Sequence, residues 1–238
     1  MMGVKALVCP PLFFVVLLFC SFAPFCDCFL AGEHQLHHLS PTLRRGQQPP
    51  RMAQDFEAIT PELRDFVHQQ PLFFVATAPT APDGHVNLSP KGMQGTFRFL
   101  SDAAARRLLP PHHPTAAGAP EAGPHHPLAG PSKGLFCYLD LGGSGVETPA
   151  HLRENGRVTV MFCAFAGPPK ILRLYGRGWC LEPGAPGWDD VLAEFPAEAL
   201  ARFPPEKLRN AVLVDVRRVR DSCGYGVPTV AVLGGEEG

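Results

Sequence analysis

Apolar residues recur from residue 72 to residue 219, either alternating with polar ones or in short runs, and predict β-strands. Turns of hairpin length, rich in Gly and Pro, separate most of these stretches. This pattern predicts a mainly β (α+β) fold, a barrel of six to seven antiparallel strands with short peripheral helices, and not a doubly wound parallel sheet. The predicted strands are Leu72–Ala78, His85–Leu88, Thr96–Leu100, Leu135–Leu141, Arg157–Phe165, Ile171–Leu181 and Ala211–Val219.

Helices are predicted between some of the strands. Apolar residues recur at three- and four-residue spacing from Phe56 to Val67 and indicate an amphipathic helix. We expect this helix to begin with Thr60 as its N-cap and to end before Pro71. A shorter helix is expected from about Thr148, as its N-cap, to Gly156, whose missing side chain suits a helix end. Two further short helical stretches are expected at Trp188–Phe195 and Ala197–Phe203.

Residues 1–51 are typical of a targeting leader. Their apolar core, Leu12–Cys20, is nine residues long, which fits a signal peptide better than a membrane span. Residues 31–51 are basic and poor in acid, as in transit peptides. This order is similar to the bipartite plastid leaders of algae with secondary plastids. We expect a plastid location, with the secretory pathway or an uncleaved anchor as alternatives, and one folded domain over residues 52–238.

A tract rich in Pro, Ala, Gly and His interrupts the predicted domain at Leu109–Pro131. It holds almost no large apolar residue and therefore cannot build a core. We predict a disordered insertion at about 103–132. The pairs His112-His113 and His125-His126 within it suggest at most a weak surface metal site, so no metal is predicted for the fold.

Charge and cysteine content narrow the function classes. Lys and Arg number 21 against 22 Asp and Glu, a net charge of −1, which argues against nucleic-acid binding and against stable association with acidic membranes once the leader is removed. Three cysteines of the domain, Cys137, Cys163 and Cys180, lie in apolar runs and are expected to be buried free thiols. Cys223 is expected to be the most accessible.

The turn Gly142–Gly145 lies between a predicted strand and a predicted helix and is a candidate anion site. Glycines allow backbone N–H groups to converge, and the start of a helix adds a partial positive charge. Ser144 and Thr148 would add hydroxyl groups. The spacing does not fit a dinucleotide fingerprint, because Thr148 stands where the third glycine would be. A plain structural turn remains an alternative reading.

Two basic residues on predicted strands are candidates for completing a phosphate pocket. Lys91 directly follows a predicted strand and stands close to Ser89. Arg173 lies within an apolar strand, where it faces either solvent or a buried anionic partner. The local sequence does not decide between these two orientations.

Seven motifs in one order give a more specific indication. They are Asn87–Gly92, Tyr138–Leu141, Gly143–Thr148, Ala150–Leu152, Met161–Phe165, Ile171–Gly178 and Ser222–Pro228. Together they resemble pyridoxamine 5'-phosphate oxidase-like proteins over about residues 52–228.

The resemblance implies a homodimeric split β-barrel that binds FMN at the subunit interface. It places Lys91 and Ser89 at the phosphate-binding strand end and Ser144 and Thr148 at the phosphate-side turn. It makes Arg173 the polar residue of the strand that flanks the flavin.

The resemblance implies an FMN-binding flavoprotein, which we expect to be an oxidoreductase of unknown substrate. The sequence indicates no catalytic residue. A non-catalytic flavin- or haem-binding protein is the alternative, and a deazaflavin- or nicotinamide-linked reductase is a third. In true pyridoxamine phosphate oxidases, basic residues near the C-terminus hold the substrate phosphate. No basic residue follows Tyr225 here, which argues against vitamin B6 oxidation.

Overall fold

The computed structural model describes residues 53–109, 128 and 130–231. The predicted leader (1–51), most of the predicted insertion (110–127 and 129) and the Gly/Glu tail lie outside the described residues.

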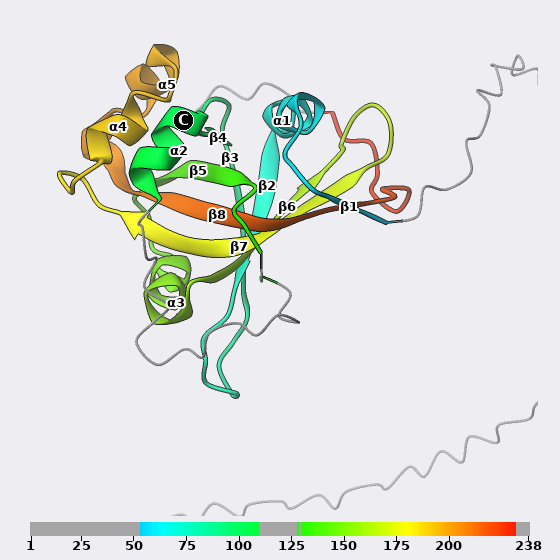
Figure 1. The fold of residues 1–238 in the computed structure, drawn as a ribbon, viewed down its shortest axis with the longest axis horizontal. Helices are drawn as coiled ribbons and strands as arrows, with labels where there is room; N and C mark the ends of the chain where they lie inside the picture. Colours follow the sequence, from blue (N-terminus) through cyan, green and yellow to red (C-terminus); the bar gives the residue numbers. More distant parts are fainter. Residues whose placement is uncertain (1–52, 110–127, 129, 232–238) are drawn as a thin grey trace, which may run out of the picture. The chain divides into compact units, whose positions relative to one another are not determined.

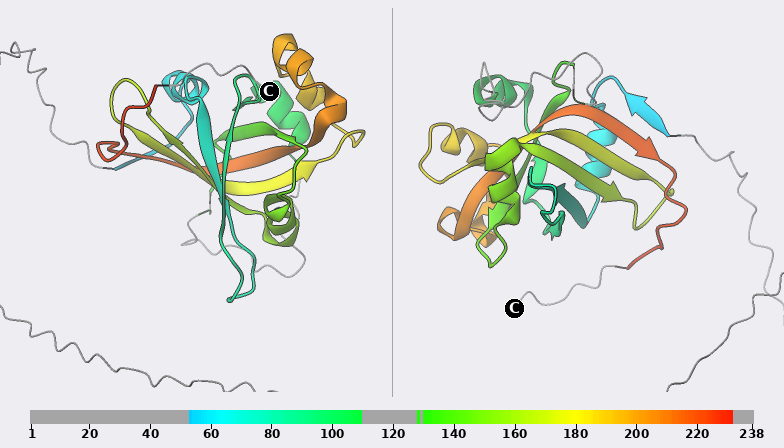
Figure 2. Two further views of the ribbon diagram at one scale, coloured as in Figure 1. Left: turned by 180° about the vertical axis from the view of Figure 1, so that it is seen from behind. Right: turned by 90° about the horizontal axis from the view of Figure 1, so that it is seen from below.

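The described chain forms one antiparallel sheet of eight strands that curls on itself (Figures 1 and 2). The strand order is β3-β2-β6-β7-β8-β5-β4, and the short β1 pairs with β8. This confirms the predicted antiparallel barrel class. The strands are β1 (Gln54–Phe56), β2 (Leu72–Thr77), β3 (Asn87–Gly92), β4 (Phe97–Phe99), β5 (Gly134–Leu141), β6 (Arg157–Cys163), β7 (Ile171–Leu181) and β8 (Leu208–Ser222).

Short helices surround the sheet. They are α1 (Pro61–His68), α2 (Asp102–Leu108), α3 (Glu147–Asn155), α4 (Trp188–Leu192), α5 (Ala197–Arg202) and the 3-10 turn η1 (Pro205–Lys207). The predicted cap of α1 is confirmed, since Thr60 accepts a hydrogen bond from the Leu63 amide at 3.4 Å. Gly156 ends α3 in the left-handed conformation, with φ of 68°, which a residue without Cβ adopts at low cost.

Three sequence predictions need correction. Helix α3 begins at Glu147 with Val146 as its N-cap, so Thr148 is inside the first turn and does not cap it. Strand β3 begins two residues after His85 and extends to Gly92, so Lys91 lies within the strand. Register with β2 decides this, because Thr77 pairs with the first residue of β3.

The predicted insertion also begins too early. Residues 103–108 belong to helix α2, which Ser101 caps by accepting a hydrogen bond from the Ala104 amide at 3.2 Å. Ala104 and Ala105 are buried against strand β5. Their small side chains permit close helix–sheet packing, although composition alone grouped them with the Pro/Ala/Gly tract.

Two apolar layers hold the sheet. Inside the curl, aromatic rings from β2, β4, β5 and β6 pack together, with Phe73 and Phe162 5.3 Å apart between ring centroids. On the other side of β5 and β8, residues such as Leu135 and Leu213 are covered by α2, α4 and α5. Strand β8 is therefore buried on both faces over its central part. Helix α3 packs against β2, β6 and β7, and Trp179 and Leu181 of β7 pack against the helix-covered layer.

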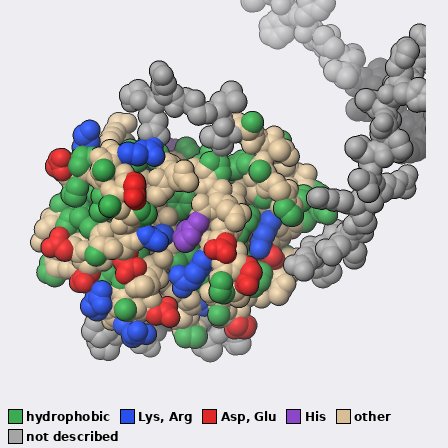
Figure 3. Space-filling model, turned by 90° about the horizontal axis from the view of Figure 1, so that it is seen from above, with side chains coloured by type: hydrophobic (Ala, Val, Ile, Leu, Met, Phe, Trp, Pro, Cys, Tyr) green, Lys and Arg blue, Asp and Glu red, His purple; other side chains and the backbone are tan. Residues whose placement is uncertain are grey.

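On the face that Figure 3 shows, basic and acidic side chains are interspersed. Among the helices of the described ranges, none is both long enough and apolar enough to cross a bilayer.

Candidate cofactor-binding site

The opening of the barrel lies where β3 approaches β5. These strands are not hydrogen-bonded neighbours, because β2, β6, β7 and β8 stand between them in the sheet order. Lys91 of β3 nevertheless reaches Asp140 of β5, with Nζ 2.8 Å from Oδ1. The curl of the sheet therefore places an ion pair across the opening.

A second cation joins this pair. Arg209 at the start of β8 lies 3.7 Å from Asp140, measured from Nη1 to Oδ2. The Asp140 side chain is only 5% exposed, whereas those of Lys91 and Arg209 are 30% and 23% exposed. Two cations therefore lie beside one buried carboxylate at the opening, and the Glu147 carboxylate lies close to Gly145 in the turn that Arg209 holds.

A cavity of about 300 Å³ lies at this opening. Its lining residues are Phe73, Pro90, Lys91, Gly92, Met93, Thr96, Tyr138, Leu139, Asp140 and Leu141. The Lys91 ammonium lies 5.9 Å from the centroid of the Tyr138 ring. The cavity thus combines an aromatic and aliphatic wall with one charged pair.

Tyr138 contributes an unsatisfied polar atom to this region. The residue is 1% exposed, and its hydroxyl has no hydrogen-bond partner among the described residues. Burial, with a contribution from Asp140, raises the pKa of Tyr138 well above its ordinary value, so the hydroxyl stays protonated and is a hydrogen-bond donor. A buried donor without a partner indicates a place for a water molecule or a ligand atom.

Ser89 and Thr148 are brought together through Asn87. The Ser89 hydroxyl donates to Asn87 Oδ1 at 2.9 Å, and Asn87 Nδ2 donates to Thr148 Oγ1 at 2.9 Å. Asn87 also donates to Thr77 Oγ1 at 3.2 Å, and that hydroxyl lies 3.0 Å from His151 Nδ1. Thr148 is 5% exposed, and its hydroxyl already accepts a hydrogen bond from Asn87, which links α3 to β3.

Ser144 lies on the exposed turn between β5 and α3. It makes no hydrogen bond within the described part of the chain. No side chain caps the N-terminus of α3, whose N-cap is Val146. Arg209 holds this turn in place, because its two terminal nitrogens donate hydrogen bonds to the carbonyl oxygens of Gly143 and Gly145.

Arg173 is not brought together with the other predicted residues. Its neighbours Leu172 and Leu174 are fully buried in the core, so Arg173 points to the outer face of β7 by strand alternation. There its Nη1 donates to Ser222 Oγ at 3.1 Å. The sequence left open whether Arg173 faces solvent or a buried anionic partner, and the structure places its side chain on the outer face of β7.

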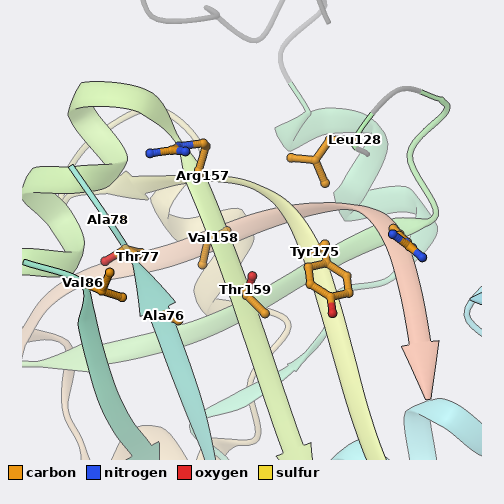
Figure 4. Close-up of a pocket in the computed structure, with 10 residues that line it drawn as sticks. Ala76, Thr77, Ala78, Val86, Leu128, Arg157, Val158, Thr159 and Tyr175 are labelled. Atoms are coloured by element: carbon orange, nitrogen blue, oxygen red, sulfur yellow. The ribbon is translucent and has the colours of Figure 1, made fainter. Parts of the chain in front are cut away.

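The outer face carries a second cavity of about 430 Å³ (Figure 4). Its lining residues are Ala76, Thr77, Ala78, Val86, Leu128, Arg157, Val158, Thr159, Tyr175 and Arg218. The Arg218 guanidinium lies 5.7 Å from the Tyr175 ring centroid and holds Asp55 through two hydrogen bonds of 2.9 and 3.0 Å. None of the five predicted site residues lines this cavity.

Within the described ranges no group of three or more His, Cys, Asp or Glu side chains is placed to hold a metal ion. The four cysteines there are unpaired; Cys137 and Cys163 are buried, Cys180 is half-buried and Cys223 is exposed.

Sequence reasoning missed four residues of the site. Asp140 and Tyr138 lie in a motif that the sequence singled out, and an acidic residue within an apolar strand is itself a signal of a buried partner. Asn87 also lies in such a motif, but its bond to Thr148 joins residues 61 positions apart. Arg209 carried no local signal, because its contacts with the glycine turn join residues more than 60 positions apart.

An antiparallel sheet curled around an aromatic core, with a cationic opening between two strands that do not pair, defines a split β-barrel. No family model matches the chain. A curated relative, the pyridoxamine 5'-phosphate oxidase family protein ustO of Aspergillus flavus, is 35% identical over 174 residues. The chain is a homologue of this pyridoxamine 5'-phosphate oxidase family protein. The match covers 73% of this chain and 55% of the relative, so the chain spans about half the length of that protein.

Two solved structures show a looser likeness. One is a Clostridium acetobutylicum protein related to general stress protein 26, of the pyridoxinephosphate oxidase family, with 11% identity and a TM-score of 0.40 over 68% of this chain and 86% of that one. The other is an FAD-binding protein of Mesorhizobium loti, with 14% identity and a TM-score of 0.40 over 72% and 97%. The family assignment rests on the sequence match.

Proposed function

We propose that the chain is an FMN-binding flavoprotein that holds the cofactor at the opening between β3 and β5, and that it acts as an oxidoreductase. The observation that carries the proposal is the presence of two cations, Lys91 and Arg209, beside a cavity of about 300 Å³. A phosphate monoester needs cationic and N–H donors, and a flavin ring needs an aromatic or aliphatic wall.

The residues present fit both parts of such a cofactor. Lys91, Arg209 and the exposed Ser144 turn would hold the phosphate, and the buried Tyr138 hydroxyl would donate a hydrogen bond to a polar ligand atom. Phe73 and Tyr138 would exclude water from one side of the ring. When bound, the flavin supplies hydride transfer; the chain's own residues bind, orient and shield it.

We further propose that two copies associate through the outer face of β2, β3, β6 and β7. Val86 and Leu88 are 72% and 62% exposed there, and the 430 Å³ cavity lies beside them. In such a homodimer, Arg173 of one copy would approach the flavin bound by the other. This arrangement explains why a residue expected at the flavin lies away from Lys91 within a single chain.

For the leader we propose plastid targeting, which fusion of residues 1–51 to a fluorescent protein would test.

The test is an absorbance spectrum of the full chain purified after FMN is supplied, with mass spectrometry of the cofactor released on denaturation. Flavin bands and a released mass of FMN support the proposal. A folded, colourless protein contradicts it, and a haem spectrum instead favours the non-catalytic haem-binding alternative. Turnover of the yellow protein with a reductant and oxygen then separates an oxidoreductase from a flavin-binding protein without activity.

A further inference from the structure

We infer that the outer-face cavity of about 430 Å³ is a binding site for a small aromatic carboxylate, separate from the opening between β3 and β5. The two cavities share no lining residue. The outer-face cavity lies on the face through which two copies are proposed to associate, so a second copy would cover a ligand bound there. Its lining is complete within one chain, and the inference therefore rests neither on flavin binding nor on association.

The floor of this cavity is one row of side chains across four strands. Ala76 of β2 pairs with Thr159 of β6, which pairs with Tyr175 of β7. Tyr175 pairs in turn with Arg218 of β8. Paired residues on neighbouring strands point to the same side of a sheet, and Figure 4 shows Thr159 and Tyr175 on adjacent strands of the floor. Small side chains beside an aromatic ring give a flat surface that suits a planar ligand ring.

Apolar side chains of the hairpin between β2 and β3 form a wall above this floor. Ala78 and Val86 both line the cavity, and Val86 is 72% exposed. A ligand ring packed against them would remove apolar area from water, which is favourable. A cavity of about 430 Å³ lies within the range of sites that hold small molecules.

Three polar groups of the lining keep hydrogen-bonding capacity for a ligand. The hydroxyls of Thr159 and Tyr175 make no hydrogen bond within the described part of the chain. Arg157 donates to two neutral oxygens, Asn155 Oδ1 through Nε at 3.4 Å and the Pro79 carbonyl through Nη2 at 3.1 Å. Its Nη1 takes part in neither bond. Two hydroxyls and a guanidinium are the donors that a carboxylate accepts from.

Carboxylates near the cavity limit the charge of the ligand. Asp55 accepts two hydrogen bonds from Arg218, at 2.9 and 3.0 Å, and so already balances that cation. Glu154 accepts a hydrogen bond from the Thr80 amide at 2.9 Å and lies within electrostatic reach of Arg157. A dianion such as a phosphate would be repelled by both carboxylates, whereas a single carboxylate needs only the Arg157 guanidinium and the two hydroxyls. The cavity therefore favours a monoanion.

The experiment compares 2-naphthoate with its neutral analogue 2-naphthamide, each titrated into the full-length protein by calorimetry. The carboxylate should bind more tightly than the amide by about 10-fold or more. Arg157→Gln should weaken 2-naphthoate binding by about 10- to 100-fold, the range for a lost hydrogen bond to a charged group, and leave 2-naphthamide binding unchanged. Ala76→Leu fills the cavity without a change of charge and should abolish binding of both probes.

Arg153→Gln is the matched control. Arg153 lies on α3, pairs with Glu182 at 2.6 Å and does not line the cavity. This variant should retain the wild-type dissociation constants of both probes. Thermal unfolding of each variant shows whether it is folded; if Arg157→Gln is not, Ala76→Leu decides.

Several outcomes would overturn the inference. Equal affinities of the wild-type protein for the two probes, or binding of neither at millimolar concentration, would show that the cavity recognises no aromatic carboxylate. Unchanged binding of 2-naphthoate by Ala76→Leu would place the probe elsewhere on the protein. Loss of 2-naphthoate binding after saturation with FMN would assign the cavity to the flavin, whereas an unchanged dissociation constant supports a separate site. A protein that binds 2-naphthoate but not FMN would refute only the proposed function.

Discussion

The Nζ atom of Lys91 and the Oδ1 atom of Asp140 lie 2.8 Å apart, although 49 residues separate them in the sequence. Lys91 belongs to the edge strand β3 and Asp140 to β5, at the far side of the curled sheet. The pair therefore joins the two strands on either side of the barrel opening and also places a charged group there.

Replacement of Lys91 by Ala should lower the free energy of unfolding by about 1–3 kcal/mol, because the buried Asp140 carboxylate loses its nearest cation. Urea unfolding followed by fluorescence measures this. Arg107→Ala breaks an exposed pair with Asp190 and should cost less than about 1 kcal/mol. Equal effects of the two substitutions would mean that the Lys91–Asp140 pair contributes no more than a surface pair.

Lys91→Ala and Arg173→Ala should weaken FMN binding in different ways. Lys91 lines the cavity at the opening, so its loss should weaken binding at every protein concentration. Arg173 lies on the outer face and should act through association of two copies, with a larger loss at low protein concentration. Flavin titrations at two protein concentrations measure this. The double variant should purify without colour; a yellow double variant would remove both residues from the proposed site.

Gly176 marks a close approach of β7 to β8, where the pairing register shifts between Tyr175 and Gly176. A Cβ atom at Gly176 would lie 2.2 Å from the Asp215 carbonyl oxygen. Gly176→Ala should therefore destabilise the protein by about 1–3 kcal/mol or more, measured by urea unfolding. Gly143→Ala is the control, because nothing lies within 4 Å of a Cβ there. Unchanged stability of Gly176→Ala would mean that β8 shifts freely.

The cysteines of the described residues should differ sharply in reactivity. Burial raises the pKa of Cys180 to about 11 and raises the pKa of Cys137 further, whereas Cys223 is exposed. Since the thiolate is the reactive form, alkylation of the native protein at neutral pH should label Cys223 first among these. Peptide mass mapping checks this, with Cys223→Ser as the control. Early labelling of Cys137 would contradict the packing of β5.

The free energy of unfolding should depend on Asp55 as the pH becomes acidic. The hydrogen bond from Arg218 lowers the pKa of Asp55 below its ordinary value of 3.8. A carboxyl whose folded-state pKa is lowered stabilises the fold above its unfolded-state pKa, and this contribution is lost as the pH falls through the folded-state pKa. Asp55→Asn should therefore cost up to about 1 kcal/mol at pH 7, a surface-pair value, and the difference from wild type should vanish at low pH.

Unfolding at several pH values measures this dependence. Asp83→Asn, in the exposed turn between β2 and β3, is the control and should follow the wild-type curve. An Asp55→Asn variant with the wild-type pH profile would mean that β1 is held to β8 by its backbone pairing alone.

Much of the architecture could be predicted from local pattern. Alternating apolar residues located seven of the eight strands, and Thr60 and Gly156 marked a helix start and a helix end, because caps depend on a few neighbouring residues. The three-residue β1 was missed, since its pairing with β8 joins Gln54 to Asp221 and leaves no local signal. The helical part of residues 103–132 was missed because burial of Ala104 depends on β5.

For the site, the sequence alone determined which residue types were present: Lys91, Ser89, Ser144 and Thr148 stood in motifs suited to phosphate, and the order of motifs indicated the family. Only the tertiary structure decided that Lys91 and Arg209 both lie beside Asp140. It also placed Arg173 on the other face. The physical reason is that charge balance and side-chain direction follow from which strands meet when the sheet curls, and those contacts join residues far apart in sequence.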